Sequence, residues 1–255
     1  MSECKPAKIP KLVIGLAIFA FAFAVLAGQI KRVLQAPTEK KLGESSDSAL
    51  VRSLLRENLD QRRFSFATVI EATSDRRVLP LDPEDPVHQR ILTAIEKVMA
   101  RACADLSAPD SPVRKLRRIN EGSRFFEEAL MKGLNDIPGL SCAIPTNRQG
   151  EHQRSGYPDL KLTDEESGTV FYLDPKLVEK SSWKSSFRSF YFEPKDRTLK
   201  INDDAVHLLI GIGHDGRNGA WTFSDWKVVD LATLSVRLKA EFQASNRDLY
   251  NTDAE

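Results

Sequence analysis

The sequence predicts an α/β domain in which a mixed sheet is flanked by helices. An amphipathic helical pattern at 121–134 precedes two strand patterns joined by a polar turn at 157–173. Further strand patterns follow at 205–213 and 220–229, and leucines at helical spacing over 230–242 predict a closing helix. Because helices and strands are interleaved along the chain, a layered α/β sandwich is the expected architecture.

The composition limits the classes of function. The 255 residues include 37 Lys and Arg against 36 Asp and Glu, so contact with a polyanion would have to come from a local basic patch. Cys4, Cys103 and Cys142 show no metal-ligand spacing; Cys103 and Cys142 would either pair in an exported domain or stay buried thiols. The sequence contains no Ser/His/Asp order, glycine-rich phosphate loop or zinc signature.

An uncharged run of seventeen residues, Leu12 to Gly28, lies near the N-terminus. As a helix it would span about 26 Å, slightly short of the roughly 30 Å hydrocarbon core of a bilayer. We expect residues 1–28 to be an uncleaved single-pass transmembrane anchor, or alternatively a signal peptide cleaved on export. The length of the run favours the anchor, and the small residues near Ala27 favour cleavage.

Two further segments are expected before the α/β domain, which we place at 119–250. Residues 29–46 form a polar tether, and 47–118 form a helical extension. Asp85-Pro86 is typical of a helix start, with a capping side chain followed by proline at the first helical position. The apolar stripe after it consists of Val87, Ile91, Ile95, Val98 and Ala102.

The segment 157–173 predicts an antiparallel hairpin. Residues 157–162 alternate between apolar and polar, as a half-buried strand does, and 169–173 are rich in β-branched and aromatic residues. The polar turn 163–168 between them ends in glycine. Since proline has no N–H to donate, we expect the second strand to end or open at Pro175.

Three side chains of this hairpin could form one site. Side chains two apart in a strand lie on one face, so Asp174 and Lys176 point the same way, and Asp159 can sit across from them. Two carboxylates at a strand end can bind Mg²⁺ through oxygen and leave positions for water and a phosphate. Lys176 could position or deprotonate the attacking water, or neutralise charge developing on phosphorus.

The pattern Pro158-Asp159 followed by Asp174-Pro175-Lys176 resembles the PD-(D/E)xK nuclease superfamily, which has the restriction-endonuclease-like fold. The resemblance covers roughly residues 120–250. It implies a Mg²⁺-dependent, or Mn²⁺-dependent, endonuclease that hydrolyses DNA phosphodiester bonds. It also implies that Asp159 and Asp174 bind the metal and that Lys176 is the catalytic cation.

In that superfamily a helix before the hairpin often carries a further metal-binding Glu. Here Glu127 best matches this element, and Glu121 and Glu128 are rivals. Glu127 lies at the margin of the helix's apolar stripe, a position that equally suits an ordinary surface acid.

A basic segment follows the hairpin. Between Lys176 and Lys200 there are seven Lys or Arg against three acids, a local charge of +4, with aromatics interleaved. Lys180, Lys184 and Arg188 are therefore predicted to contact DNA phosphates, and the aromatic rings could stack on bases. The alternative is a charged loop whose aromatics anchor it to the core. A second basic cluster at 114–118 could flank the same groove or be a solvated surface.

Two other functions remain open at this stage. The chain could be a non-catalytic nucleic-acid-binding or protein-binding module of the same fold, or a membrane-anchored structural or adaptor domain. His207, in the strand 205–213, is expected to be a core or edge histidine. A structure separates these alternatives, because a nuclease requires Asp159, Asp174 and Lys176 to converge.

Overall fold

A computed structural model describes residues 46–59, 61–186, 190–193, 195, 197–217, 219–239 and 241–250. They divide into two compact units, of which Gln61–Leu238 is one. The other comprises the two ends of the chain, whose described helices are α2 (Ser46–Arg56) and α6 (Asn246–Tyr250). The predicted anchor or signal peptide lies outside the described residues. No described helix is long and apolar enough to cross a membrane.

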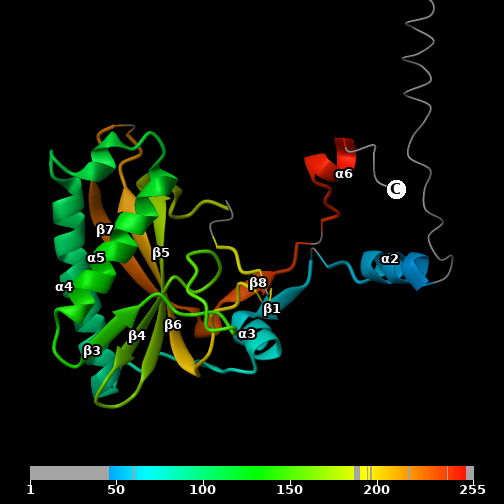
Figure 1. Cartoon of the computed structure of the whole chain (residues 1–255), viewed down its shortest axis with the longest axis horizontal. Helices are drawn as coiled ribbons and strands as arrows, with labels where there is room; N and C mark the ends of the chain where they lie inside the picture. Colours follow the sequence, from blue (N-terminus) through cyan, green and yellow to red (C-terminus); the bar gives the residue numbers. More distant parts are fainter. Residues whose placement is uncertain are drawn as a thin grey trace, which may run out of the picture. The chain divides into compact units, whose positions relative to one another are not determined.

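The unit Gln61–Leu238 contains one six-stranded mixed sheet in the order β2-β6-β5-β4-β3, with β7 also paired to β6 (Figure 1). The strands are β2 (Val78–Leu79), β3 (Leu140–Ala143), β4 (Leu160–Asp164), β5 (Val170–Glu179), β6 (Ala205–His214) and β7 (Phe223–Asp230). β6 runs parallel to β2 and β5, and the other pairs are antiparallel. The predicted mixed sheet and the hairpin β4–β5 are confirmed.

Two long helices, α4 (Pro86–Ser107) and α5 (Ser123–Asn135), cover one face of this sheet. As the sequence predicted, Asp85 caps α4, and its Oδ1 accepts hydrogen bonds from the N–H groups of Val87 (2.7 Å) and His88 (3.2 Å). α4, which the sequence analysis placed in the helical extension, packs in the same hydrophobic core as α5 and the sheet.

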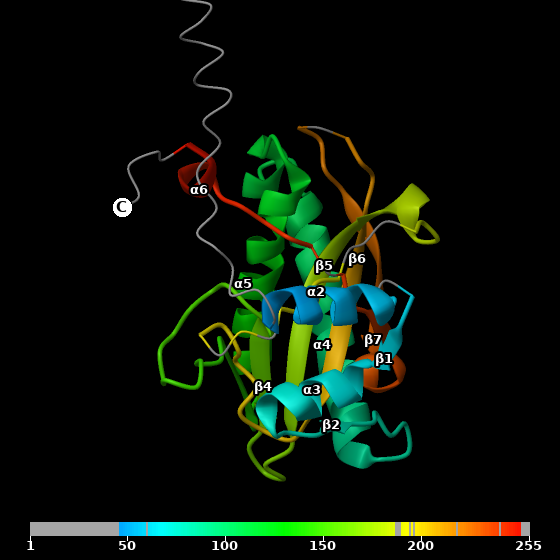
Figure 2. The ribbon, with the colours of Figure 1, turned by 90° about the vertical axis from the view of Figure 1, so that its right-hand side faces the viewer.

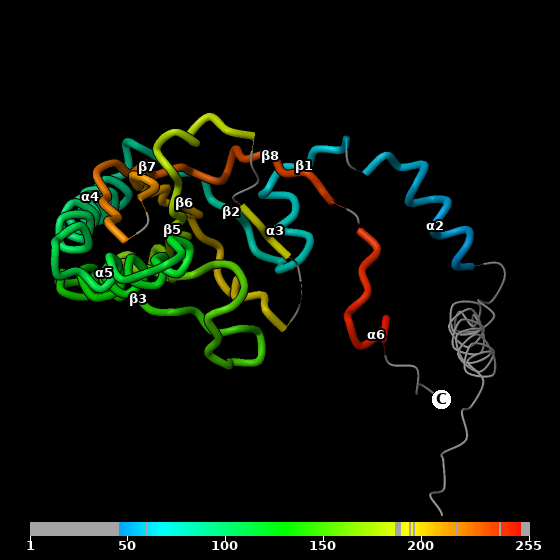
Figure 3. The backbone as a smooth tube through the Cα atoms, turned by 90° about the horizontal axis from the view of Figure 1, so that it is seen from above, coloured from blue at the N-terminus to red at the C-terminus, as the bar shows by residue number. Residues whose placement is uncertain are grey.

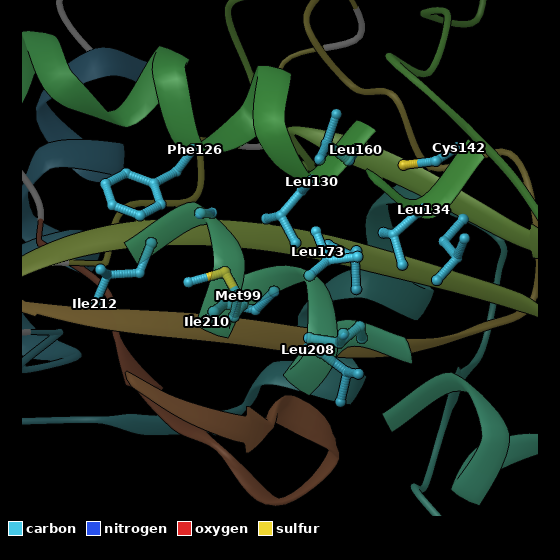
Figure 4. Close-up of a cluster of buried hydrophobic side chains, with 14 of the residues drawn as sticks. Met99, Phe126, Leu130, Leu134, Cys142, Leu160, Leu173, Leu208, Ile210 and Ile212 are labelled. Carbon is cyan, nitrogen blue, oxygen red and sulfur yellow. The ribbon is translucent and has the colours of Figure 1, made fainter. Parts of the chain in front are cut away.

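Alternate residues of the central strands point to opposite faces of the sheet. On the α4/α5 face, Leu173 of β5 and Leu208 of β6 pack into the large apolar core (Figure 4). On the other face, Tyr172 and His207, which are register partners, lie under α3 (Phe66–Ser74). Figures 2 and 3 show α3 on the opposite side of the sheet from α4 and α5. We call this second side the α3 face.

The α3 face has a smaller core. Its buried members are Phe66, Ile70, Tyr157, Val170, Tyr172, Leu199, Ile201, Ala205 and Leu231. Residues from the loop between β5 and β6 therefore close over this face and bury part of it.

The predicted helix over 230–242 is wrong. A short 3-10 turn, η4 (Leu231–Thr233), is followed by the strand β8 (Ser235–Arg237), which pairs antiparallel with β1 (Arg63–Ser65). Leu231 and Leu234 do pack inward, but onto the α3-face core. A turn followed by a strand can thus bury the same leucines whose spacing indicated a helix.

β5 does not end at Pro175. It continues to Glu179, because β6 pairs with it in parallel as far as Glu179↔His214. Its pairing with β4 stops at Leu160↔Leu173, so β5 is open on its β4 side from Asp174 onward. Pro175, which has no N–H group, therefore lies where β5 has lost its pairing with β4 and keeps its pairing with β6.

Candidate active site

Asp159, Asp174 and Lys176 converge on the α3 face where β4 and β5 separate. Lys176 Nζ lies 3.4 Å from Asp159 Oδ2 and donates a hydrogen bond of 3.0 Å to Asp174 Oδ1. Two carboxylates therefore contact one ammonium group. This is the convergence that a nuclease site requires, and it places all three residues at the open edge of β5.

The two carboxyl groups differ in their surroundings. The side chain of Asp174 is 4% exposed and that of Asp159 is 18% exposed. Burial raises the pKa of Asp174 to about 7; the negative charge of Asp159 adds to the rise and Lys176 opposes it. Burial thus destabilises the charged form of Asp174, and a bound cation or an ion pair with Lys176 would offset that cost.

Lys176 stays a cation in this arrangement. Burial acts to lower its pKa, but the neighbouring charges of Asp174 and Asp159 outweigh burial, and the pKa is raised. A lysine held protonated between two carboxylates can donate hydrogen bonds to a phosphate oxygen.

Glu127 of α5 is half-buried and lies in the electrostatic environment of the same group. Burial raises the pKa of its carboxyl, Asp159 raises it further, and Arg154, Lys176 and Lys200 oppose the rise. Of its two rivals, Glu128 is exposed and bonded to Arg154 Nη2 at 3.2 Å, and Glu121 is exposed. Glu127 is thus the helix acid that faces the site charges.

Lys200, which the sequence places only in the basic patch, lies in the electrostatic environment of the site. Lys200 is fully buried, and its pKa is lowered by burial while Asp159, Glu127 and Asp174 oppose the shift. Its Nζ donates to the carbonyl oxygen of Gln153 at 3.4 Å. The local sequence does not predict this burial, because the neighbours of Leu199 and Ile201 in an extended segment would point away from the side that those two residues bury.

The described cations of the basic segment do not share one environment. Lys180 forms an ion pair of 3.5 Å with Asp225, Lys184 is exposed, and Arg188 lies outside the described residues. Since Lys200 is buried, the cations counted together in the sequence have different environments.

The aromatic residues of that segment anchor it to the protein. The ring of Trp183 packs so closely on β6 that a side chain at Gly211 or Gly213 would press against it, and Lys227 Nζ lies 4.7 Å from its ring centre. Phe190 and Phe192 pack edge-on against Phe66 of α3. These three rings therefore anchor the segment to the protein, as the alternative interpretation expected, and their contacts do not favour stacking on DNA bases.

The oxygen atoms at this site suit a hard divalent cation. Lys176 Nζ lies 3.0 Å from each oxygen of Asp174, yet only Oδ1 accepts a hydrogen bond; Oδ2 is buried and has no hydrogen-bond partner among the described residues. A buried carboxylate oxygen with free lone pairs, beside a second carboxylate, fits Mg²⁺. The described part of the chain contains no group of three or more acidic, His or Cys side chains that could hold a metal, so Glu127 does not complete a three-residue set.

The chain was compared with proteins of known function. A sequence model of the type II restriction enzyme MjaV family matches residues 58–253, more than three quarters of the chain. A relative described as "Type II restriction enzyme MjaV", from Methanocaldococcus jannaschii, is 27% identical over 214 residues, covering 80% of this chain and 92% of the relative. The matched region includes every candidate residue above. The chain therefore belongs to the type II restriction enzyme MjaV family.

Proposed function

We propose that the chain is a divalent-metal-dependent DNA endonuclease of the PD-(D/E)xK superfamily. The observation that carries the proposal is the contact of Asp159 and Asp174 with one lysine ammonium at the open edge of β5. Family membership supports DNA as the substrate, because the relative is described as a type II restriction enzyme.

In the proposed mechanism Asp159 and Asp174 hold Mg²⁺ or Mn²⁺ through their oxygens, with Glu127 as the candidate for a further ligand. The metal would polarise the phosphoryl oxygen and supply a more acidic water. The Oδ2 atom of Asp174 supports this assignment, because it is buried and accepts no hydrogen bond from the residues described, although the ammonium group of Lys176 lies 3.0 Å away.

Lys176 would act on the phosphate rather than as a base. Its raised pKa keeps it protonated, and a protonated lysine stabilises the negative charge that develops on the phosphoryl oxygens. Removing such a donor commonly costs about 100- to 1000-fold in kcat. Because lysine is not a ligand for Mg²⁺, its loss should spare metal binding.

The test is cleavage of plasmid and genomic DNA with Mg²⁺, with Mn²⁺ and with EDTA. We expect cleavage that depends on the metal and that falls at least about 100-fold in Lys176→Met. Lys161→Met is a matched control, since Lys161 lies on the same face, is 32% exposed against 31% for Lys176, and pairs with Asp203 at 2.7 Å. Cleavage that persists in EDTA, or equal activity of Lys176→Met and Lys161→Met, contradicts the proposal.

A further inference from the structure

Tyr157, two residues before Asp159, makes a buried contact with His207 of β6. Its hydroxyl and His207 Nδ1 are 2.8 Å apart, and the two rings are stacked, with centres 5.8 Å apart and an interplanar angle of 15°. Tyr157 is 6% exposed and His207 is fully buried. The pair thus links the loop that carries Asp159 to the centre of the sheet.

Both members of the pair are neutral. Burial lowers the pKa of His207 to about 3, so the imidazole carries one proton. The pKa of Tyr157 is raised well above its usual value, first by burial and then by the charges of Asp174 and Asp159, so the phenol keeps its proton. Two neutral groups of this kind share one hydrogen bond, in which either the phenol or the Nδ1–H group is the donor.

His207 Nε2 is buried and has no hydrogen-bond partner within the described part of the chain. A buried polar atom without a partner costs stability, whereas an apolar side chain at the same place would not. Packing alone therefore does not account for a histidine at 207. The contact that distinguishes it from an apolar residue is the hydrogen bond to Tyr157.

That hydrogen bond matters because the strand ladder does not hold Asp159. The pairing of β4 with β5 begins at Leu160↔Leu173, one residue after Asp159. The loop before Asp159 has to set its position. In that loop the carbonyl oxygen of Tyr157 accepts a hydrogen bond of 3.3 Å from the N–H of Lys200, so Tyr157 is held through both its backbone and its side chain.

Packing on the same loop leaves little room for another arrangement. Gly156 has a φ of +86°, and any side chain there would collide with the carbonyl oxygen of Thr198. Phe66, Phe190 and Phe192 surround the Tyr157 ring with edge-on contacts. The ring is thus enclosed, and its hydroxyl is directed at His207.

We propose that the Tyr157–His207 hydrogen bond positions the carboxylate of Asp159 for metal binding. The inference rests on the proposed function, because it assigns Asp159 to the metal. Tyr157 and His207 are positioning residues: they act through Asp159, and neither is a metal ligand. Hydrogen bonds behind a ligand commonly change metal affinity or activity about 10- to 100-fold.

The experiment compares Tyr157→Phe with Tyr172→Phe in the full-length protein. Tyr172 is an equally buried tyrosine that also contacts the His207 ring, but its hydroxyl donates to Asp203 Oδ2 (2.7 Å) and accepts from the N–H of Asn202 (2.9 Å). Both variants lose one buried hydroxyl and should lose thermal stability. Only Tyr157→Phe should weaken Mn²⁺ binding measured by calorimetry, by about 10-fold or more.

Two variants at His207 keep the test informative if Tyr157→Phe folds poorly. His207→Leu removes the hydrogen-bond partner of the Tyr157 hydroxyl, and His207→Asn places a side-chain amide, which can accept or donate, near the position of Nδ1. We expect weaker Mn²⁺ binding in His207→Leu and partial recovery in His207→Asn. In cleavage assays, Tyr157→Phe should need more Mg²⁺ for half-maximal activity while the KM for DNA stays unchanged.

The outcomes separate this inference from the proposed function. Wild-type protein that cleaves DNA with Mg²⁺, together with Tyr157→Phe that binds Mn²⁺ as tightly as wild type, overturns the positioning role alone. Equal loss of Mn²⁺ affinity in Tyr157→Phe and Tyr172→Phe also overturns it, since general loosening of the core would then be the cause. Wild-type protein that neither binds Mn²⁺ nor cleaves DNA overturns both proposals.

Discussion

The two faces of the central sheet are built by alternate residues of the same strands, yet they have opposite characters. On the α4/α5 face, Leu173 and its neighbours pack into an apolar core. On the α3 face, one residue along, Asp174 is 3% exposed, and His207 and Lys200 are fully buried. Both faces exclude water. On the α4/α5 side the buried Asp164 is paired with Arg90 of α4, whereas on the α3 face Asp159, Asp174 and Lys176 gather at one open strand edge.

The difference teaches that the two faces contribute differently to stability, because buried ionisable groups offset part of what the smaller apolar core of the α3 face supplies. Apolar burial on the α4/α5 face stabilises the fold. On the α3 face, burial raises the pKa of Asp174 and lowers that of His207, so folding disfavours their charged forms. A divalent cation that binds the Asp174 carboxylate would restore stability on this face, because it favours the charged form.

The largest expected effect is on the α4/α5 face. Phe126 of α5 is fully buried (Figure 4), and the centres of its ring and the ring of Phe223 are 4.8 Å apart. Phe126→Ala should lower the free energy of unfolding by about 3–5 kcal/mol, as large-to-small changes in cores do. Urea unfolding measures the loss. If the faces are independent, DNA cleavage per folded molecule stays near wild type; a parallel loss of kcat would show that they are coupled.

On the α3 face, removal of a charge should stabilise the metal-free protein. The pKa of Asp174 is raised from 3.8 to about 7, so the folded protein binds this proton more tightly than the unfolded chain. The contribution of Asp174 to stability is therefore highest at low pH and falls as the pH rises from about 4 to 7. Asp174→Asn stays neutral and should be more stable than wild type at pH 8, by up to about 4 kcal/mol.

Thermal unfolding in EDTA at pH 4 and pH 8 measures this effect. The two proteins should differ most at pH 8 and least at pH 4, where Asp174 is protonated in the folded protein and about half protonated in the unfolded chain. Lower stability of Asp174→Asn at pH 8 would mean that the ion pair with Lys176 outweighs the cost of burial.

The smallest expected effect concerns the basic segment. Lys184 is exposed and Lys180 is bonded to Asp225, so Lys184→Ala should reduce the dependence of DNA affinity on salt more than Lys180→Ala. One lost phosphate contact lowers the slope of log affinity against log salt by about 0.9. Lys97→Ala and Lys132→Ala, in the outer groove between α4 and α5, are charge-matched controls. A larger change in these controls would place DNA on the α4/α5 side.

The hairpin and its three charged residues could be predicted from the sequence because they depend on local rules. Alternation placed Asp174 and Lys176 on one face, and Asp159 lies beside them because it directly precedes Leu160, the first paired residue of the hairpin. The helix stripe similarly predicted α5 and left Glu127 at its margin.

Long-range packing explains what the sequence did not reveal. β8 forms because β1, more than 160 residues earlier, pairs with it, and no local pattern contains that partner. Lys200 and the Tyr157–His207 bond depend on the β5–β6 loop returning to the sheet, as does the anchoring of Trp183 on β6. Each of these contacts joins segments that the sequence keeps apart.

The most direct test of the central claim is Mn²⁺ binding to wild type, Asp159→Asn, Asp174→Asn and Lys176→Met, measured by calorimetry without DNA. If the two carboxylates share one metal, both Asn variants should lose affinity by at least about 10-fold, the size of effect known for residues behind a metal ligand. Lys176→Met should bind as tightly as wild type or more tightly, because a competing cation is gone. Asn variants that bind Mn²⁺ as wild type does would contradict the metal site and the mechanism built on it.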